Sequence, residues 1–314
     1  MNRRGQLWLA VLVLLGACDH ARARAPTARD VGPRYYVVGP RPTQTLGRKA
    51  FKLLPGFGVV IEEQRNVAGE MVGRTSLGRD LPMKDLRPVT PSSFTGVFMQ
   101  GRTFDFGWVV REGAAVREQP SSTSRQLARY PLYARLRLNS HSGPEGYWRL
   151  AEGWMASDDL RVPRLSSPPL GVAPDEPWID VELESQTLVA YRGAIPVLAT
   201  LISTGVGAPG TAFETPPGLH RVRAKLLAAT MDNLTHQGVV PYSYEEVPHT
   251  QYIGRVALHG AFWHDQFGHR RSHGCINLSV TDAEWLFSFT RPALPKGEHE
   301  ISASNETGTM VRVR

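Results

Sequence analysis

The chain has 314 residues and is basic, with 36 Lys and Arg residues against 29 Asp and Glu residues and a formal net charge of +7. This length suffices for more than one hydrophobic core. The basic residues are spread along the chain, and the sequence contains no recognition helix, aromatic RNA-binding motif or zinc finger, which argues against nucleic-acid binding.

The N-terminus reads as an export signal. Two arginines are followed by an apolar segment over residues 7–15, which is too short to span a bilayer as a mature helix. The Leu-Gly-Ala-Cys run at positions 15–18 resembles the bacterial lipobox, in which the cysteine receives lipid. The resemblance implies a lipoprotein signal peptide over 1–17, lipidation of Cys18 and a cell-envelope location, lipid-anchored at the periplasmic or extracytoplasmic face. An ordinary cleaved secretory signal remains the alternative.

Residues 18–33 contain Arg, Ala and Pro and predict a tether. Without the two arginines of the signal peptide the formal charge falls from +7 to +5, a basic character that favours anionic wall polymers or lipid headgroups. The chain has two cysteines. With Cys18 lipidated, Cys275 is the only free thiol and no intramolecular disulfide can form, which suits a thiol kept for chemistry in an oxidising compartment.

Two β-rich blocks follow, over residues 34–90 and 106–163. Both are rich in β-branched and aromatic residues broken by Gly and Pro, and both lack long amphipathic helical periodicity, so short strands are predicted. Their similar ends, at 83–89 and 157–162, indicate a divergent repeat of two small barrels. The second block resembles the bacterial SH3 module and the first does so weakly. A wall-binding module and a spacer remain equal alternatives, because small barrels need aromatic residues for packing in either case.

A proline-rich stretch over 164–177 predicts a semi-stiff linker. After it, residues 178–183 alternate apolar with acidic residues, which predicts a half-buried strand. The part of the chain from residue 178 onward is expected to have its own core, so that a chain beginning near Pro174 would fold alone. Farther along, Glu245 and Glu246 are predicted to be solvated charges, because adjacent residues rarely present both carboxylates to one point.

The chemistry is expected in the run Ser-His-Gly-Cys-Ile-Asn at 272–277, with a His-Gly pair at His259, sixteen residues before Cys275. A thiol reacts as the thiolate, and a nearby imidazole can take its proton. Gly274 has no Cβ, so the backbone beside the nucleophile can turn sharply. A short helix is predicted after the run, from a capping box that begins at Thr281 through about Phe289, with a stop near Pro292.

Two other interpretations of this cysteine remain open. Cys275 could be a small buried hydrophobic residue. It could also join nearby histidines in a zinc site, although the spacing matches neither Cys-x-x-Cys nor His-Glu-x-x-His, and we predict no metal. The histidines in question are His259, His264, His269 and His273.

The stretch 259–277 resembles the signature of the L,D-transpeptidase catalytic domain, the YkuD-type fold: a His, a gap of about fifteen residues, then Ser/Thr-His-Gly-Cys-hydrophobic-Asn. Here the gap is twelve residues, which predicts a trimmed loop. The Thr-Pro-Pro-Gly run at 215–218 is similar to the Thr-Pro-x-Gly of the family. The resemblance covers about 177–303. It implies a mainly β chain, with one or two small SH3-like barrels before a β-rich YkuD-type catalytic domain over 178–303 that has a short helix after the cysteine motif.

This resemblance implies a role for each motif residue. Cys275 is expected to attack a peptide carbonyl and form a thioester, while His259 first removes the thiol proton and then protonates the leaving amine. Backbone amides near Gly274 and Cys275 are expected to hold the oxyanion, with His273 shaping this hole.

Other residues are expected to support these groups. Gly260 is expected to orient the catalytic imidazole through its backbone carbonyl. Ser272 and Asn277 are predicted to brace the loop and strand, and Trp263 and Tyr252 to form walls for the substrate. The polar, aromatic stretch over 226–252 is expected to cover the cleft, as the corresponding region does in the family.

The substrate implied by the resemblance is a peptidoglycan tetrapeptide stem, from which terminal D-Ala is released and whose acyl group passes to an amine to form a 3→3 cross-link. Alternatives are transfer to water, transfer to a protein lysine, and a non-catalytic wall-binding lipoprotein. Peptidoglycan and the membrane, through lipid on Cys18, are the expected partners, and a monomer without cofactor is expected. A chain that begins near Pro174 is predicted to keep catalysis.

Overall fold

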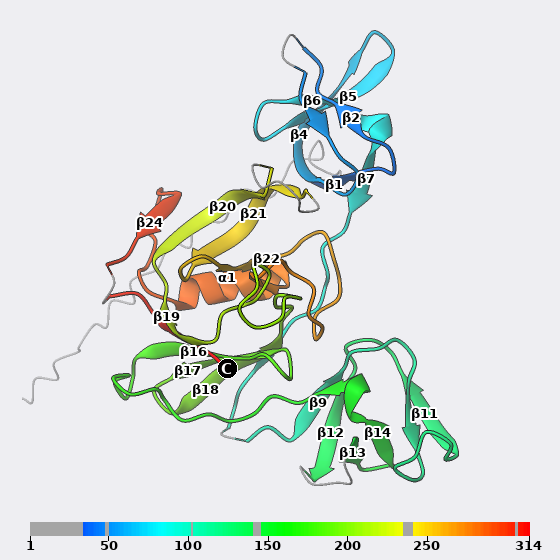
Figure 1. The fold of residues 1–314 in the computed structure, drawn as a ribbon, viewed down its shortest axis with the longest axis vertical. Helices are drawn as coiled ribbons and strands as arrows, with labels where there is room; N and C mark the ends of the chain where they lie inside the picture. The colour runs from blue at the N-terminus through cyan, green and yellow to red at the C-terminus, as the bar shows by residue number, and fades with distance from the viewer. Residues whose placement is uncertain (1–33, 48–49, 102, 141–145, 235–240, 305–306) are drawn as a thin grey trace, which may run out of the picture. The chain divides into compact units, whose positions relative to one another are not determined.

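The computed structural model describes residues 34–314 except 48–49, 102, 141–145, 235–240 and 305–306 (Figure 1). The predicted signal peptide, tether and lipidation site at Cys18 lie outside the described residues. The described part is mainly β, as predicted from the sequence, and its one α-helix follows the cysteine motif. No helix within these described ranges has the length and apolar character needed to cross a membrane.

The first β block folds around a small apolar core that includes Val38, Val59 and Leu81, all fully buried. Its long strand is buried at its start and exposed at its end, where it extends into a hairpin with the next strand. The elements are β1 (Tyr35–Val38), β2 (Thr43–Gln44), β3 (Lys52–Leu53), β4 (Gly58–Val67), β5 (Glu70–Thr75), β6 (Asp80–Pro82), a 3-10 helix (Met83–Asp85) and β7 (Leu86–Val89).

The second β block forms one seven-stranded sheet in the order β11-β10-β14-β13-β12-β9-β15, curled around a core that includes Val116, Leu150 and Met155. Like the first block, it ends in a 3-10 turn followed by a short strand, at the position where the sequence predicts a repeat. The elements are β9 (Phe106–Val109), β10 (Ala114–Arg117), β11 (Gln126–Tyr130), β12 (Arg135–Ser140), β13 (Tyr147–Leu150), β14 (Trp154–Ala156), a 3-10 helix (Ser157–Asp159) and β15 (Leu160–Arg161).

The C-terminal part packs two sheets around α1. One sheet has the order β19-β25-β16-β17-β18-β8, and the other contains β20, β21, β22, β23 and β24. Figure 1 shows α1 between the β20–β21 pair and the strands β16 to β18. The elements are β16 (Pro177–Glu182), β17 (Thr187–Arg192), β18 (Ile195–Leu201), β19 (Gly218–Arg221), β20 (Ala224–Asp232), β21 (Ser243–Tyr252), β22 (Ala257–Gly260), β23 (Ile276–Leu278), α1 (Val280–Phe289), β24 (Glu300–Ser302) and β25 (Met310–Val313).

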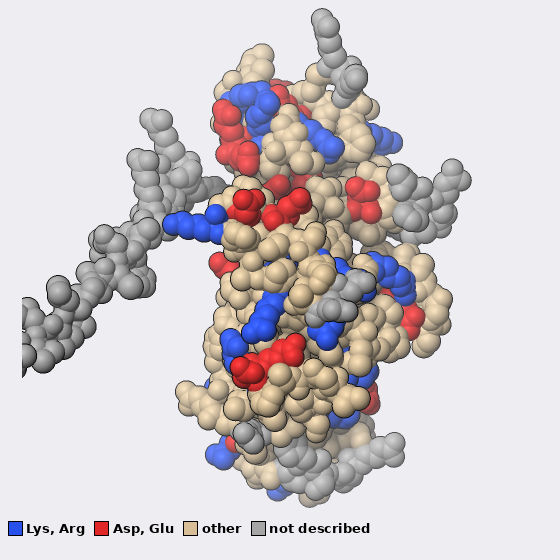
Figure 2. Space-filling view, turned by 90° about the vertical axis from the view of Figure 1, so that its left-hand side faces the viewer, with Lys and Arg blue, Asp and Glu red and all other residues tan. Residues whose placement is uncertain are grey.

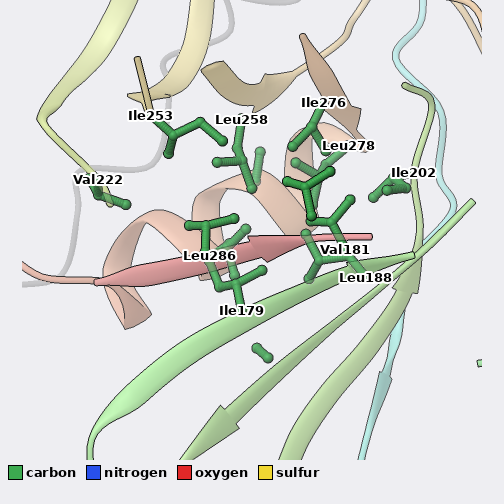
Figure 3. Close-up of a cluster of buried hydrophobic side chains, with 14 of the residues drawn as sticks. Ile179, Val181, Leu188, Ile202, Val222, Ile253, Leu258, Ile276, Leu278 and Leu286 are labelled. Carbon is green, nitrogen blue, oxygen red and sulfur yellow. The ribbon is translucent and has the colours of Figure 1, made fainter. Parts of the chain in front are cut away.

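Apolar side chains from both sheets meet around this helix and form one continuous core (Figure 3). Burial on this scale is the main stabilising contribution available to such a fold. Strand β23, which follows Cys275, is therefore anchored by its apolar residues on the core side. The labelled members are Ile179, Val181, Leu188, Ile202, Val222, Ile253, Leu258, Ile276, Leu278 and Leu286.

The strand predicted as half-buried over 178–183 is buried on both faces instead, since every residue of β16 is buried. Its acidic residues do not face water. Asp180 accepts hydrogen bonds from Arg312 (2.7 Å) and Arg314 (2.9 Å), and these charged partners compensate its burial. The arginines belong to β25 and the residue after it, so this sheet includes a strand beyond residue 303, where the sequence analysis ends the domain.

The N-terminus of α1 differs from the capping box predicted at Thr281. The N-cap is Ser279, whose side chain accepts a hydrogen bond from the Asp282 backbone N–H (3.2 Å). The helix ends at Phe289, as predicted. At that end the buried Lys225 ammonium donates to three backbone carbonyls at distances of 2.5–2.9 Å, which satisfies groups that a helix terminus leaves unpaired.

The segment between the two β blocks is part of the C-terminal core. Strand β8 (Val97–Phe98) pairs with β18, and the Gly96 backbone N–H donates to the buried Asp282 carboxylate (3.0 Å). An added Cβ at Gly96 would lie 2.5 Å from Ala199 O, so the close approach of the two chains requires glycine.

A single aromatic cluster also joins the second β block to the C-terminal part. Trp108 and Trp178 are both buried within it, and Trp178 stacks on Tyr191 with ring centroids 4.4 Å apart. The core around α1 lies wholly within residues 179–313, as the predicted independent core requires, but a chain beginning near Pro174 would lack the five buried members of this aromatic cluster that precede residue 164. The members before residue 164 are Phe94, Phe104, Phe106, Trp108 and Val110.

Glu245, predicted to be a solvated charge, is almost fully buried in β21. Arg79 of the first β block donates to its carboxylate (3.1 Å), and burial raises the pKa of Glu245 to about 7. The first block meets β21 again where Gly58 pairs with Tyr244. On the face shown in Figure 2, basic and acidic side chains are interspersed, with no continuous basic surface.

Candidate active site

The two halves of the motif meet on paired strands. Strands β22 and β23 run parallel, with His259 opposite Asn277. Cys275 directly precedes β23, two residues before Asn277, so the turn at the start of this strand brings the thiol close to Asn277 and His259. All three side chains line one cleft of about 390 Å³.

His259 is a buried, neutral imidazole. Burial lowers its pKa to about 4. Its Nδ1 lies 3.1 Å from the backbone oxygen of Gly260. A carbonyl only accepts, so Nδ1 carries the proton and Nε2 keeps a free lone pair. The sequence analysis expected this carbonyl contact, and the geometry leaves Nε2 able to accept a proton.

Cys275 is half-buried, and burial raises the pKa of its thiol above the ordinary value, with a smaller opposing effect from a hydrogen bond to the Ala257 backbone. Near neutral pH the resting site therefore holds a neutral thiol and a neutral imidazole. Such a pair forms the thiolate only as the imidazole takes the proton, so nucleophilic attack and proton transfer are coupled.

The backbone before Cys275 is held in a tight turn. Gly274 has φ +116°, a conformation that L side chains rarely adopt, and an added Cβ would lie 3.0 Å from Glu214 O. Ser272 Oγ donates to the Cys275 carbonyl and accepts from the Gly274 N–H (3.1 Å). The Gly274 amide is thus engaged, and of the two predicted oxyanion donors the Cys275 amide remains.

Thr215 supports the same turn from another part of the chain. Its hydroxyl donates to the Gly274 carbonyl (2.7 Å) and accepts from the Gly205 N–H (2.8 Å). This is the threonine of the Thr-Pro-Pro-Gly run, so that motif and the cysteine motif are physically connected. The sequence analysis did not assign Thr215 a role at the site.

Asn277 links the motif strand to the loop before it through His264. The Gln266 N–H points at His264 Nδ1 (3.3 Å), so a neutral ring carries its proton on Nε2. The Asn277 amide lies 3.0 Å from that Nε2, and its Oδ1 otherwise lacks a hydrogen bond within the described ranges. The Nε2 proton of His264 needs an acceptor, and Asn277 Oδ1 needs a donor. Both are satisfied when Oδ1 faces His264 and accepts from Nε2–H. Burial lowers the pKa of His264 to about 4, consistent with a neutral ring.

Aromatic rings form the walls of the cleft. Trp263 stacks on Tyr244, with centroids 3.8 Å apart, and His273 stacks on Tyr242 at 4.6 Å. These four side chains line the cleft, but Tyr252, predicted as a wall, does not. Tyr252 is half-buried near Cys275, at the end of the strand that carries Tyr244.

The sequence analysis missed two basic lining residues, Arg270 and Arg271. Arg270 donates to the backbone oxygens of Gly205 and Leu183, so it braces the loop, and both arginines are exposed. Their position directly before the motif was the available signal. Among the described residues, no group of three or more His, Cys, Asp and Glu side chains is placed to hold a metal ion.

Comparison with known proteins identifies the C-terminal part. Residues 176–313 match the family model of the YkuD L,D-transpeptidase catalytic domain. The comparison with curated proteins gives no match. The domain over 176–313 is thus of the β-rich YkuD type, consistent with the resemblance drawn from the motif.

Three solved structures are similar to the chain. A crystal structure of a mutant Enterococcus faecium L,D-transpeptidase is 27% identical over 44% of this chain and 50% of that chain, with a TM-score of 0.34. An NMR structure of the E. faecium catalytic domain acylated by ertapenem is 28% identical over 45% and 98%, with a TM-score of 0.33. The L,D-transpeptidase from Mycobacterium smegmatis is 15% identical over 82% and 99%, with a TM-score of 0.34. The match thus spans half the length of the first of these proteins.

Proposed function

We propose that the chain is a cysteine-dependent L,D-transpeptidase that acts on peptidoglycan tetrapeptide stems. The observation that carries the proposal is the placement of a neutral His259 on β22 and of Cys275 directly before the paired strand β23, both lining the same cleft. The family match over residues 176–313 supports the reaction class.

In the proposed reaction, Cys275 Sγ attacks the carbonyl between the third residue of the stem and its terminal D-Ala. His259 Nε2 takes the thiol proton and then gives it to the leaving amine of D-Ala. The Cys275 amide donates to the developing oxyanion, and loss of one such donor typically lowers the rate by about 10²–10³. A thioester results, and an amine of a second stem then attacks it to form a 3→3 cross-link.

The acyl acceptor has to be identified by experiment, because water, a stem amine and a protein lysine would all attack the same thioester.

We further propose that lipid on Cys18 holds the protein at the cell envelope. The basic composition of the chain supports such a location near anionic polymers and headgroups.

The test incubates the purified chain with disaccharide tetrapeptide and follows it by mass spectrometry. We expect release of one D-Ala per thioester, cross-linked dimer when a second stem is present, and neither product with Cys275→Ala. Tripeptide without dimer would identify water as the acceptor. Turnover that persists in Cys275→Ala would refute the proposal.

A further inference from the structure

The loop that joins the two halves of the motif, residues 261–274, forms one side of the cleft. It contributes His264, Arg270 and Arg271 to the lining and ends in the turn that holds Cys275. Its backbone is bonded to the C-terminal part, since the Gly268 N–H donates to the Ile202 carbonyl (2.8 Å) and the Arg271 N–H donates to the Thr204 carbonyl (2.8 Å). The position of the segment between the cleft and these bonds also depends on what packs against its other side.

The second β block supplies polar contacts to this loop. The Phe267 N–H donates to the hydroxyl of Tyr133 (3.1 Å). Arg161 Nε donates to the Gly268 carbonyl (3.0 Å), and His269 Nε2 donates to the Val110 carbonyl (2.8 Å). Three consecutive loop residues, 267–269, are therefore bonded to three separated positions of the block.

Packing reinforces these bonds. Phe267 is fully buried in the aromatic cluster that contains Trp108 and Val110. Gly268 has φ +94°, and an added Cβ would lie 2.4 Å from Val110 Cγ1, so the loop approaches the block as closely as glycine permits. At this point the side chain of Val110, in the block, packs directly against the backbone of Gly268, in the loop.

Tyr133 itself is held in a costly conformation. Its φ is +63°, in the left-handed region that bulky residues rarely adopt. Such strain persists only when the surroundings enforce it, and it clusters at functional positions. Here the strained residue lies in the turn between β11 and β12, and its ring packs on Phe94, with centroids 4.6 Å apart, while its hydroxyl meets the active-site loop.

We propose that the second β block is a positioning element of the active site, which holds loop 261–274 through Tyr133, Arg161 and the Val110 backbone. It acts on catalysis through the loop and touches no reacting atom. The inference rests on the proposed function, which makes Cys275 the reacting group. The effect of these contacts on the reactivity of the Cys275 thiol can nevertheless be measured without a peptidoglycan substrate.

The experiment uses the full chain with Tyr133→Phe, which keeps the ring packing and removes only the hydroxyl. Tyr130→Phe is the matched control, because its hydroxyl donates to Glu152 (2.5 Å) within the same block and is not bonded to the loop. His269→Ala is a second test variant that removes a contact from the loop side and leaves the block unchanged.

Three quantities are measured for each variant: amide hydrogen exchange over 264–271, the melting temperature, and the rate of Cys275 alkylation by iodoacetamide at pH 6–9, located by peptide mass spectrometry. For Tyr133→Phe and His269→Ala we expect loop exchange at least about tenfold faster and alkylation about tenfold slower across the pH range, since small misplacements at active sites have large effects on rate. Tyr130→Phe should match the wild type in loop exchange and alkylation.

Unchanged loop exchange, or faster exchange with unchanged alkylation, would overturn the positioning role. So would equal changes in Tyr130→Phe, which would indicate general loosening of the block. Carbapenem acylation of the same variants separates the proposed reaction from the proposed positioning role, because the thiol is acylated by a carbapenem through the same attack on a carbonyl that the reaction requires. If the wild type is not acylated but the alkylation pattern holds, the proposed reaction is wrong and the positioning role stands.

Discussion

Replacing Glu245 by Gln should change how stability depends on pH. The carboxyl has a pKa of about 7 in the folded chain against an ordinary value of 4.5. A raised pKa means that the folded state binds the extra proton, so the stability that this group contributes is full below pH 4.5 and is lost as the pH rises through 7. The difference between the two values corresponds to about 3 kcal/mol at pH 8, at roughly 1.4 kcal/mol per pKa unit.

Gln cannot ionise, so Glu245→Gln should not lose this contribution. The assay is urea unfolding of both proteins at pH 4.5, 6, 7 and 8. The unfolding free energy of the variant minus that of the wild type should grow by about 3 kcal/mol between pH 4.5 and 8. Glu246→Gln is the matched control, since it removes the adjacent carboxylate and leaves the Arg79–Glu245 pair intact.

Taking the difference between two proteins removes the contribution of other titrating groups, such as His259. A difference that stays flat with pH would show that Arg79 compensates the buried carboxylate fully and would refute the reasoning. The same slope in Glu246→Gln would point to general charge repulsion instead of burial at one site.

Three further predictions concern the enzyme. Cys275→Ala should keep the melting temperature within a few degrees and form no carbapenem adduct by mass spectrometry, and an adduct on another residue would contradict the assigned nucleophile. A chain that begins near Pro174 should melt well below the full chain in calorimetry, because it keeps the core around α1 but loses β8 and the five buried members of the aromatic cluster that precede residue 164; a melting temperature equal to that of the full chain would refute this. Cys18→Ala should release the protein from membranes in fractionation without changing its rate on soluble stems, and unchanged membrane retention would exclude the lipid anchor.

The sequence predicted the parts of the site that are encoded locally. A cysteine flanked by His and Gly, with a second His at loop distance, predicts a nucleophile and its base from residue chemistry alone, and the structure brings the two side chains to one cleft. The mainly β class and the end of α1 at Phe289 were also predictable from short stretches of sequence. β-branched and aromatic residues indicate strands, and the proline that follows the helix indicates its end.

The remaining features depend on partners that lie far away in the sequence. Arg79 and Glu245 are 166 residues apart, so nothing near Glu245 predicted that its charge would be buried. The strand at 97–98 and the hydroxyl of Tyr133 likewise gain their roles only from segments more than ninety residues later. Long-range pairings of this kind carry no periodicity that a single sequence displays.

The aromatic cluster shared by residues 94–110 and the C-terminal domain restricts how this protein could have been assembled from parts. Modules joined by flexible linkers can be exchanged between proteins as independent cassettes, but this block contributes side chains to its neighbour's interior. A foreign SH3-like block placed before residue 164 would need to supply matching rings at the positions of Phe106 and Trp108. Recombination would then preserve the block and the catalytic domain as one inherited unit, because a crossover within the proline-rich stretch would separate rings that pack together.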